Sequence, residues 1–211
     1  RELTNRVFGT LGAALLLLTL VIVIASPLFA ALFAPKWYLN DAFKFNATAD
    51  MLRITFPYLL FISMTGVAGG ILNSYDRFAV PAFTPVLLNT SLIFAALIAA
   101  PWFEQPTYAL AWGVFAAGAI QFCFQLPFLA RIHMLPVPTV DWHHPGVRKI
   151  LGLMGPAIFG VSVSQINLLL DTMLATFLPT GSVSWLYYSD RLSELLLGVF
   201  AVAIATVILP N

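Results

Sequence analysis

The chain has 211 residues, of which 60% are hydrophobic and only 9% are charged, with a net charge of +1 and a mean hydropathy of +0.92. Soluble domains carry about 25% charged residues, so this composition excludes a soluble globular domain. The sequence has no basic run, so we expect no nucleic-acid partner. Apolar stretches long enough to cross a bilayer fill nearly the whole chain, and in lipid each must satisfy its own backbone as a helix. We predict an all-α, polytopic transmembrane helix bundle with about six spans.

The predicted spans follow one another along the chain. They cover residues 7–33, 54–72, 83–102, 108–129, 150–178 and 185–209. A polar connector, residues 35–50, separates the first two spans, and the longest connector, residues 131–149, holds all three histidines. Because the chain starts at Arg1 and stops at the end of an apolar run, we expect it to be an internal piece of a longer protein.

Lysine and arginine in the connectors predict the orientation of the bundle, because cytoplasmic loops carry more of them. Residues predicted at one end are Arg1, Arg6, Arg77, Arg131, Arg148 and Lys149. Those predicted at the other end are Lys36, Lys44 and Arg53. The richer end is therefore predicted to be cytoplasmic, and it holds both ends of this piece.

A polar stripe marks the fifth span. Ser164, Asn167 and Asp171 follow the i, i+3, i+7 spacing and so share one helix face. At a rise of 1.5 Å per residue, Asp171 lies roughly 10 Å below the outer surface. A charge at that depth should face a protein interior or a water-filled cavity. The stripe indicates a transport pathway, a cation site built on Asp171 and Asn167, or a hydrogen bond between helices.

Arg191 lies at a similar depth in the sixth span, with Asp190 and Glu194 beside it. Two interpretations stay open. Arg191 is either part of a binding site for an anionic substrate, or it forms a structural ion pair with Glu194, which is three residues on and on the same face. Either acidic residue would neutralise the arginine.

Small and helix-weakening residues mark two places. Gly66 and Gly70 form a small-xxx-small pair that is typical of close helix contact in membranes. Gly155, Pro156 and Gly160 predict a bend in the fifth span, because proline removes a backbone donor and glycine adds freedom. The bend is either a fixed kink or a hinge for transport.

Enzymatic and metal-binding motifs are missing from the sequence. It contains no nucleotide-binding P-loop, no H-E-x-x-H and no G-x-S-x-G. The adjacent His143 and His144 do not share a helix face, so we interpret them as loop residues, and Cys123 as a packing residue. We therefore expect a transporter without a metal centre or organic cofactor.

Two stretches resemble the MurJ (MviN) family of lipid II flippases. They are FAVPAFTPVLLN at residues 78–89 and GSVSWLYYSDRL at residues 181–192. The second is more specific, because few proteins carry W-x-Y-Y-x-D-R-L at the head of a span. The resemblance covers essentially the whole chain.

The resemblance implies a two-lobed, MATE-like transporter fold of about fourteen helices, in which this chain corresponds to the third through eighth. Residues 1–133 would hold four helices of the first lobe, 134–149 a cytoplasmic inter-lobe loop, and 150–211 the first two helices of the second lobe. It also implies the bacterial cytoplasmic (inner) membrane and a role in peptidoglycan biosynthesis and cell shape.

The resemblance further implies that lipid II moves from the inner to the outer leaflet by alternating access. By position, Arg191 looks like a cavity arginine that binds the headgroup, with Asp190 and Glu194 as its acidic neighbours. Asp171 looks like the acidic residue of a sodium site, so sodium is the expected coupling ion. The alternatives are an exporter of another polyprenyl-linked sugar or a drug cation, or a non-transporting membrane scaffold. In every case membrane lipids surround the chain.

Overall fold

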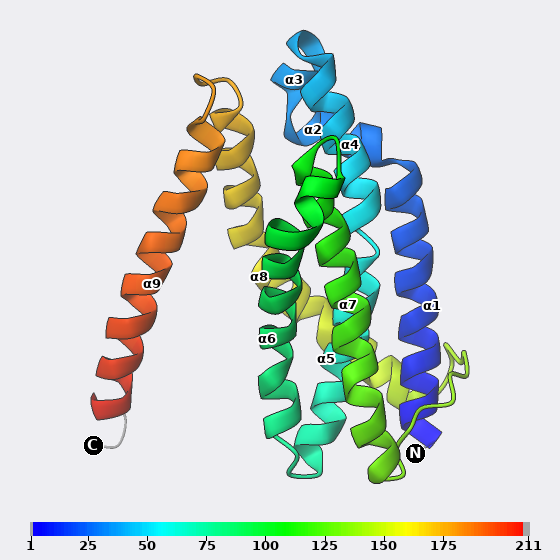
Figure 1. Cartoon of the computed structure of the whole chain (residues 1–211). Coiled ribbons are helices and arrows are strands. Elements are labelled where there is room, and N and C mark those ends of the chain that lie inside the picture. Colours follow the sequence, from blue (N-terminus) through cyan, green and yellow to red (C-terminus); the bar gives the residue numbers. More distant parts are fainter. Residues whose placement is uncertain (1, 209–211) are drawn as a thin grey trace.

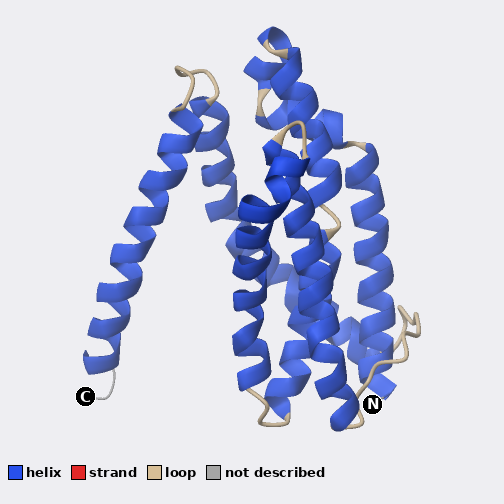
Figure 2. Cartoon of the chain, viewed as in Figure 1, coloured by secondary structure: helices blue, strands red, loops and turns tan. Residues whose placement is uncertain are grey.

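The computed structural model describes residues 2–208, with side-chain exposure for residues 2–197, and this part of the chain contains helices but no strands (Figure 2). The elements are α1 (Glu2–Ile24), α2 (Ser26–Phe33), α3 (Pro35–Asn40), α4 (Ala42–Thr55), α5 (Tyr58–Ser74), α6 (Ala79–Phe94), η1 (Ala95–Ala99), η2 (Ala100–Trp102), α7 (Pro106–Arg131), α8 (Pro145–Ala175) and α9 (Ser182–Ile208). η1 is a turn of π-helix and η2 a turn of 3₁₀-helix.

The predicted membrane helix bundle is confirmed. Among the described residues, five segments are long and apolar enough to cross a membrane. They are α1, α4 with α5, α6 with η1 and η2, α7, and α8. The sixth predicted span coincides with α9, a helix of 27 residues whose side chains are described only as far as residue 197.

The polar connector at residues 35–50 is helical, which the sequence analysis did not predict. Pro35 begins α3, where its missing N–H costs nothing. The side chain of Asp41 caps α4 by accepting a hydrogen bond from the Lys44 backbone N–H at 3.0 Å. The helix is interrupted only at residues 56–57, so the second span extends outward as α4.

Helix α8 also begins earlier than predicted, at Pro145 instead of residue 150. Asp141 Oδ1 accepts hydrogen bonds from the backbone N–H groups of His143 and His144 at 3.0 and 3.1 Å. The Nδ1 atom of His144 accepts one from the Gly146 N–H at 3.2 Å. These contacts satisfy donors at the start of α8, so the last part of the connector is helical.

The helices alternate in direction, as Figure 1 shows. The start of α1, the α5–α6 turn and the loop of residues 132–144 lie at one end of the bundle. The opposite end holds α3, the η2–α7 connection and the α8–α9 turn. This arrangement agrees with the predicted grouping of the basic residues; which end faces the cytoplasm stays a prediction.

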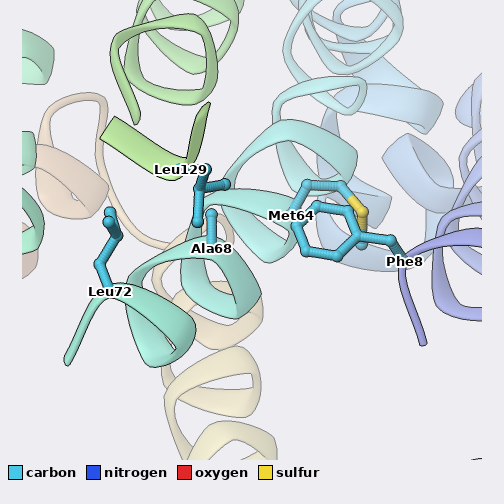
Figure 3. Close-up of a cluster of buried hydrophobic side chains, with 5 residues drawn as sticks. All are labelled: Phe8, Met64, Ala68, Leu72 and Leu129. Carbon is cyan, nitrogen blue, oxygen red and sulfur yellow. The ribbon is translucent and has the colours of Figure 1, made fainter. Parts of the chain in front are cut away.

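The core of the bundle lies where α1, α5 and α7 meet. Its buried cluster comprises Phe8, Met64, Ala68, Leu72 and Leu129 (Figure 3). Helix α6 packs against α7, and α9 packs against α8. Helix α8 crosses obliquely behind the bundle and then runs upright beside α9 (Figure 1), so it joins the bundle to α9.

Candidate functional site

Four polar residues of α9 lie on one face of that helix. Tyr187, Asp190, Arg191 and Glu194 follow the i, i+3, i+4, i+7 spacing that brings side chains to the same side. Arg191 Nη1 donates to Glu194 Oε2 at 2.8 Å. The Arg191 guanidinium carbon lies 5.2 Å from the centre of the Tyr187 ring. The structure thus brings the side chains of Tyr187, Arg191 and Glu194 together.

This face is open. The side chains of Arg191 and Glu194 are 61% and 66% exposed. An ion pair with that exposure contributes little to folding. Asp190 is partly buried and forms no ion pair within residues 2–197. The guanidinium has five N–H donors in a planar fork, and its contact with Glu194 leaves others free for an anionic ligand.

The polar stripe of α8 is also open. Ser164, Asn167 and Asp171 are exposed, and within residues 2–197 the structure gives their side chains no hydrogen bond or ion pair. Within residues 2–197, no hydrogen bond or ion pair joins this stripe to Arg191. The cation site at Asp171 and Asn167 therefore stays a prediction, and so does the interhelical hydrogen bond.

The predicted bend falls inside a continuous α8, with Pro156 in its interior. A Cβ atom added to Gly155 or Gly160 would meet no atom of the described chain within 4 Å. Neither glycine is therefore needed for close packing among the described residues. Their role as a hinge stays a prediction.

Sequence reasoning missed a set of contacts between α1 and the loop of residues 132–144, which we call the loop clasp. Arg6 forms an ion pair with Asp141. The Asn5 side chain accepts from the Val137 N–H at 2.9 Å, and Thr10 Oγ1 accepts from the Asp141 N–H at 2.9 Å. These partners are more than 130 positions apart, so no local pattern reveals them.

The loop clasp changes the acidity of Asp141. Burial raises the pKa of this carboxyl group, but hydrogen bonds from the His143 and His144 N–H groups and the charge of Arg6 outweigh it. The net result is a pKa below the ordinary value. Asp141 therefore stays ionised while it caps α8 and pairs with α1.

A second missed contact joins the opposite end of α8 to α3, and we call it the lysine clasp. Lys36 Nζ donates to the carbonyl oxygens of Phe177 and Leu178 at 3.1 and 3.2 Å. These carbonyls follow the end of α8, where cations are favoured. A cavity of about 520 Å³ lies beside the clasp, between α3 and α4 and the α8–α9 turn. The sequence analysis used Lys36 only for orientation.

The family model for lipid II flippase MurJ matches residues 1–211. The chain belongs to the MurJ family. This confirms the family that the resemblance predicted.

Relatives in the MurJ family share about half of the sequence. A Haemophilus influenzae protein named probable lipid II flippase MurJ is 50% identical, with 100% of this chain and 42% of that protein covered. A Vibrio cholerae protein of the same name is 52% identical, with 100% and 41% covered. The lipid II flippase MurJ of Burkholderia cenocepacia is 45% identical, with 82% and 34% covered.

The chain spans about two fifths of the length of the first two relatives. These matches favour the MurJ family over the scaffold and the drug exporter considered from the sequence. MurJ membership and the apolar helices together make the chain part of a multi-pass membrane protein.

Proposed function

We propose that this chain is part of a flippase that moves lipid II, the lipid-linked peptidoglycan precursor, from the inner to the outer leaflet by alternating access. The match to the MurJ family over residues 1–211 carries this proposal. The membrane would be the bacterial cytoplasmic membrane, with the start of α1 and the loop of residues 132–144 on the cytoplasmic side.

Arg191 is the residue that we assign to the headgroup. A pyrophosphate carries at least two negative charges, so its passage through a medium of low dielectric constant needs fixed positive charge. A guanidinium holds two phosphate oxygens at once and stays charged when partly desolvated. Glu194 and Tyr187 contact Arg191, and Asp190 lies on the same face. Other cationic groups would come from the rest of the full-length protein.

Asp171 and Asn167 are the residues that we assign to the coupling cation, with sodium as the expected ion. Carboxylate and amide oxygens suit hard cations. The stripe is exposed along α8, so further oxygen ligands from helices outside this chain can complete the shell. Binding of the cation there would couple its gradient to a change in α8, with Gly155, Pro156 and Gly160 as the hinge.

The test is complementation of a flippase-depleted bacterial strain by the full-length protein that contains these residues. We expect the full-length protein to restore growth and normal cell shape. Vesicles that contain the purified protein should also move lipid II between leaflets. A protein that inserts at a normal level but supports neither growth nor lipid II movement would overturn the proposal.

A further inference from the structure

Two glutamines of α7 have buried oxygen atoms without a partner. Gln121 and Gln125 are 2% and 1% exposed. Their amide nitrogens are used, because Gln121 Nε2 donates to the Thr84 carbonyl at 3.0 Å and Gln125 Nε2 to Thr84 Oγ1 at 3.1 Å. Among the described residues, neither Oε1 atom has a hydrogen-bond partner. Exchanging the positions of Oε1 and Nε2 in Gln121 would place Oε1 against the Thr84 carbonyl oxygen. The orientation of this amide is therefore fixed.

Both glutamines line a cavity of about 520 Å³ formed by α5, α6 and α7. Gly66 and Gly70 line the same cavity, and a Cβ atom added to either would meet nothing within 4 Å. The close helix contact predicted for this glycine pair is therefore not made inside the described chain. We call this cavity the glutamine groove, defined by Gly66, Gly70, Gln121 and Gln125.

The groove lies at membrane depth. Gln121 is within about 4 Å of the midpoint of α7 along the helix axis. An amide oxygen that is buried at this depth without a donor keeps its desolvation cost uncompensated, and lipid tails supply no donor. A neighbouring helix can supply such a donor, and small residues allow the two backbones to approach closely. The groove combines both features of a helix-packing site.

The described residues leave the groove open, and relatives with 100% of this chain matched have only 41–42% of their own length covered. We propose that the glutamine groove is the docking site for a transmembrane helix from that remaining part of the full-length protein. The helix presents small residues to Gly66 and Gly70, and hydroxyl or amide donors to Gln121 Oε1 and Gln125 Oε1. The proposal rests on family membership and length, and it does not depend on lipid II transport.

A photocrosslinking experiment on the full-length protein identifies the occupant. The photoreactive residue p-benzoylphenylalanine replaces Ile62, which lines the groove. A control places it at Leu97, which is 73% exposed in η1, just beyond the end of α6. We expect mass spectrometry to find a crosslink from position 62 to a peptide of the same polypeptide outside these residues. Adducts with lipid alone, as at position 97, or crosslinks only within these residues would overturn the proposal.

Thermal unfolding of the full-length protein in detergent gives a second measurement. Gly66→Leu and Gly70→Leu should lower the unfolding midpoint by several degrees, although leucine favours helix, because the added side chain displaces the docked helix. The control Ala96→Leu, at an exposed position, should leave it nearly unchanged. Equal midpoints for all three variants would show a groove open to lipid or water, and would refute the docked helix.

Discussion

Lys36 donates a hydrogen bond to the carbonyl oxygen of Leu178, 3.2 Å away and 142 positions along the sequence. This hydrogen bond connects the short helix α3 to the turn between α8 and α9. Because a lysine at the end of a helix also favours its dipole, the lysine clasp stabilises the approach of these segments.

Removal of this contact should loosen the α8–α9 turn. In the full-length protein with a single cysteine at Thr180, which lines the cavity beside the clasp, Lys36→Met should speed labelling by a charged maleimide roughly two- to fivefold. The control is Lys44→Met. Lys44 Nζ forms an ion pair with Asp41 Oδ2 at 3.0 Å, on the same side of the cavity. An equal increase in both variants would show that general positive charge, and not the clasp, controls access.

Replacement of Arg191 should separate its two interpretations. Arg191→Ala should abolish complementation. Arg191→Lys should impair it, because lysine keeps the charge but cannot form the bidentate contact with phosphate. Headgroup affinity should fall about tenfold or more. The measurements are growth of a flippase-depleted strain, membrane protein level and binding of labelled lipid II. Arg148→Ala, at an exposed position near the start of α8, serves as the control and should grow normally.

The double change Arg191→Ala with Glu194→Ala decides between a headgroup-binding role and a structural ion pair. If the pair were only structural, removal of both charges would restore what the single change destroys. For a headgroup-binding arginine, the double variant should insert at a normal level and still fail to support growth. Restored growth would leave Arg191 as an ion-pair partner.

Asp171→Asn should abolish the dependence of stability on cation concentration. The amide keeps the shape of the carboxylate but loses its charge, so sodium should no longer raise the thermal midpoint of the full-length protein. The measurement is the midpoint across a sodium titration, with potassium to keep ionic strength constant. Ser162→Ala is the control, because its hydroxyl group bonds the Ile158 carbonyl of the same helix at 2.7 Å. An undiminished sodium response in Asp171→Asn would remove the site from α8.

The loop clasp should weaken in acid. Folding lowers the pKa of Asp141 below its ordinary value, so the ionised carboxylate stabilises the folded state above that value. The stabilisation is lost as the pH falls below the ordinary value and through the lower pKa of the folded state. Asp141→Asn should therefore reduce the difference between the unfolding midpoints at neutral and acidic pH. An acid response equal to that of the unaltered protein would exclude Asp141 as a contributor.

Gly9→Ala should destabilise the protein, against the trend for helices. Alanine is favoured over glycine inside a helix by about 1 kcal/mol. At position 9, however, the added Cβ atom would collide with the backbone of Thr139, which the loop clasp holds against α1. Gly12→Ala is a matched control on the same helix, because its Cβ atom would meet Met64 Sδ at an ordinary 3.6 Å. Thermal unfolding should show a lower midpoint for the first and an equal or higher midpoint for the second.

The regular parts of this fold could be predicted because they depend on local patterns. Apolar runs located the spans, and the i, i+3 spacing indicated the contact between Arg191 and Glu194. The helices α3 and α4 were missed because charged and polar residues interrupt their apolar ones, while their starts depend on a proline and on the side-chain cap of Asp41. The two clasps were missed because each joins residues more than 130 positions apart.

The two clasps together constrain α8. Its first turn is tied to α1 through Asp141, and the carbonyls after its last turn are tied to Lys36. Both ends of α8 are therefore fixed to other helices of the bundle. While both contacts hold, the two ends of α8 keep a fixed separation. Any motion of its middle then appears as a change of curvature, or else one anchor releases first. The order in which the two anchors release would set which end of the bundle opens.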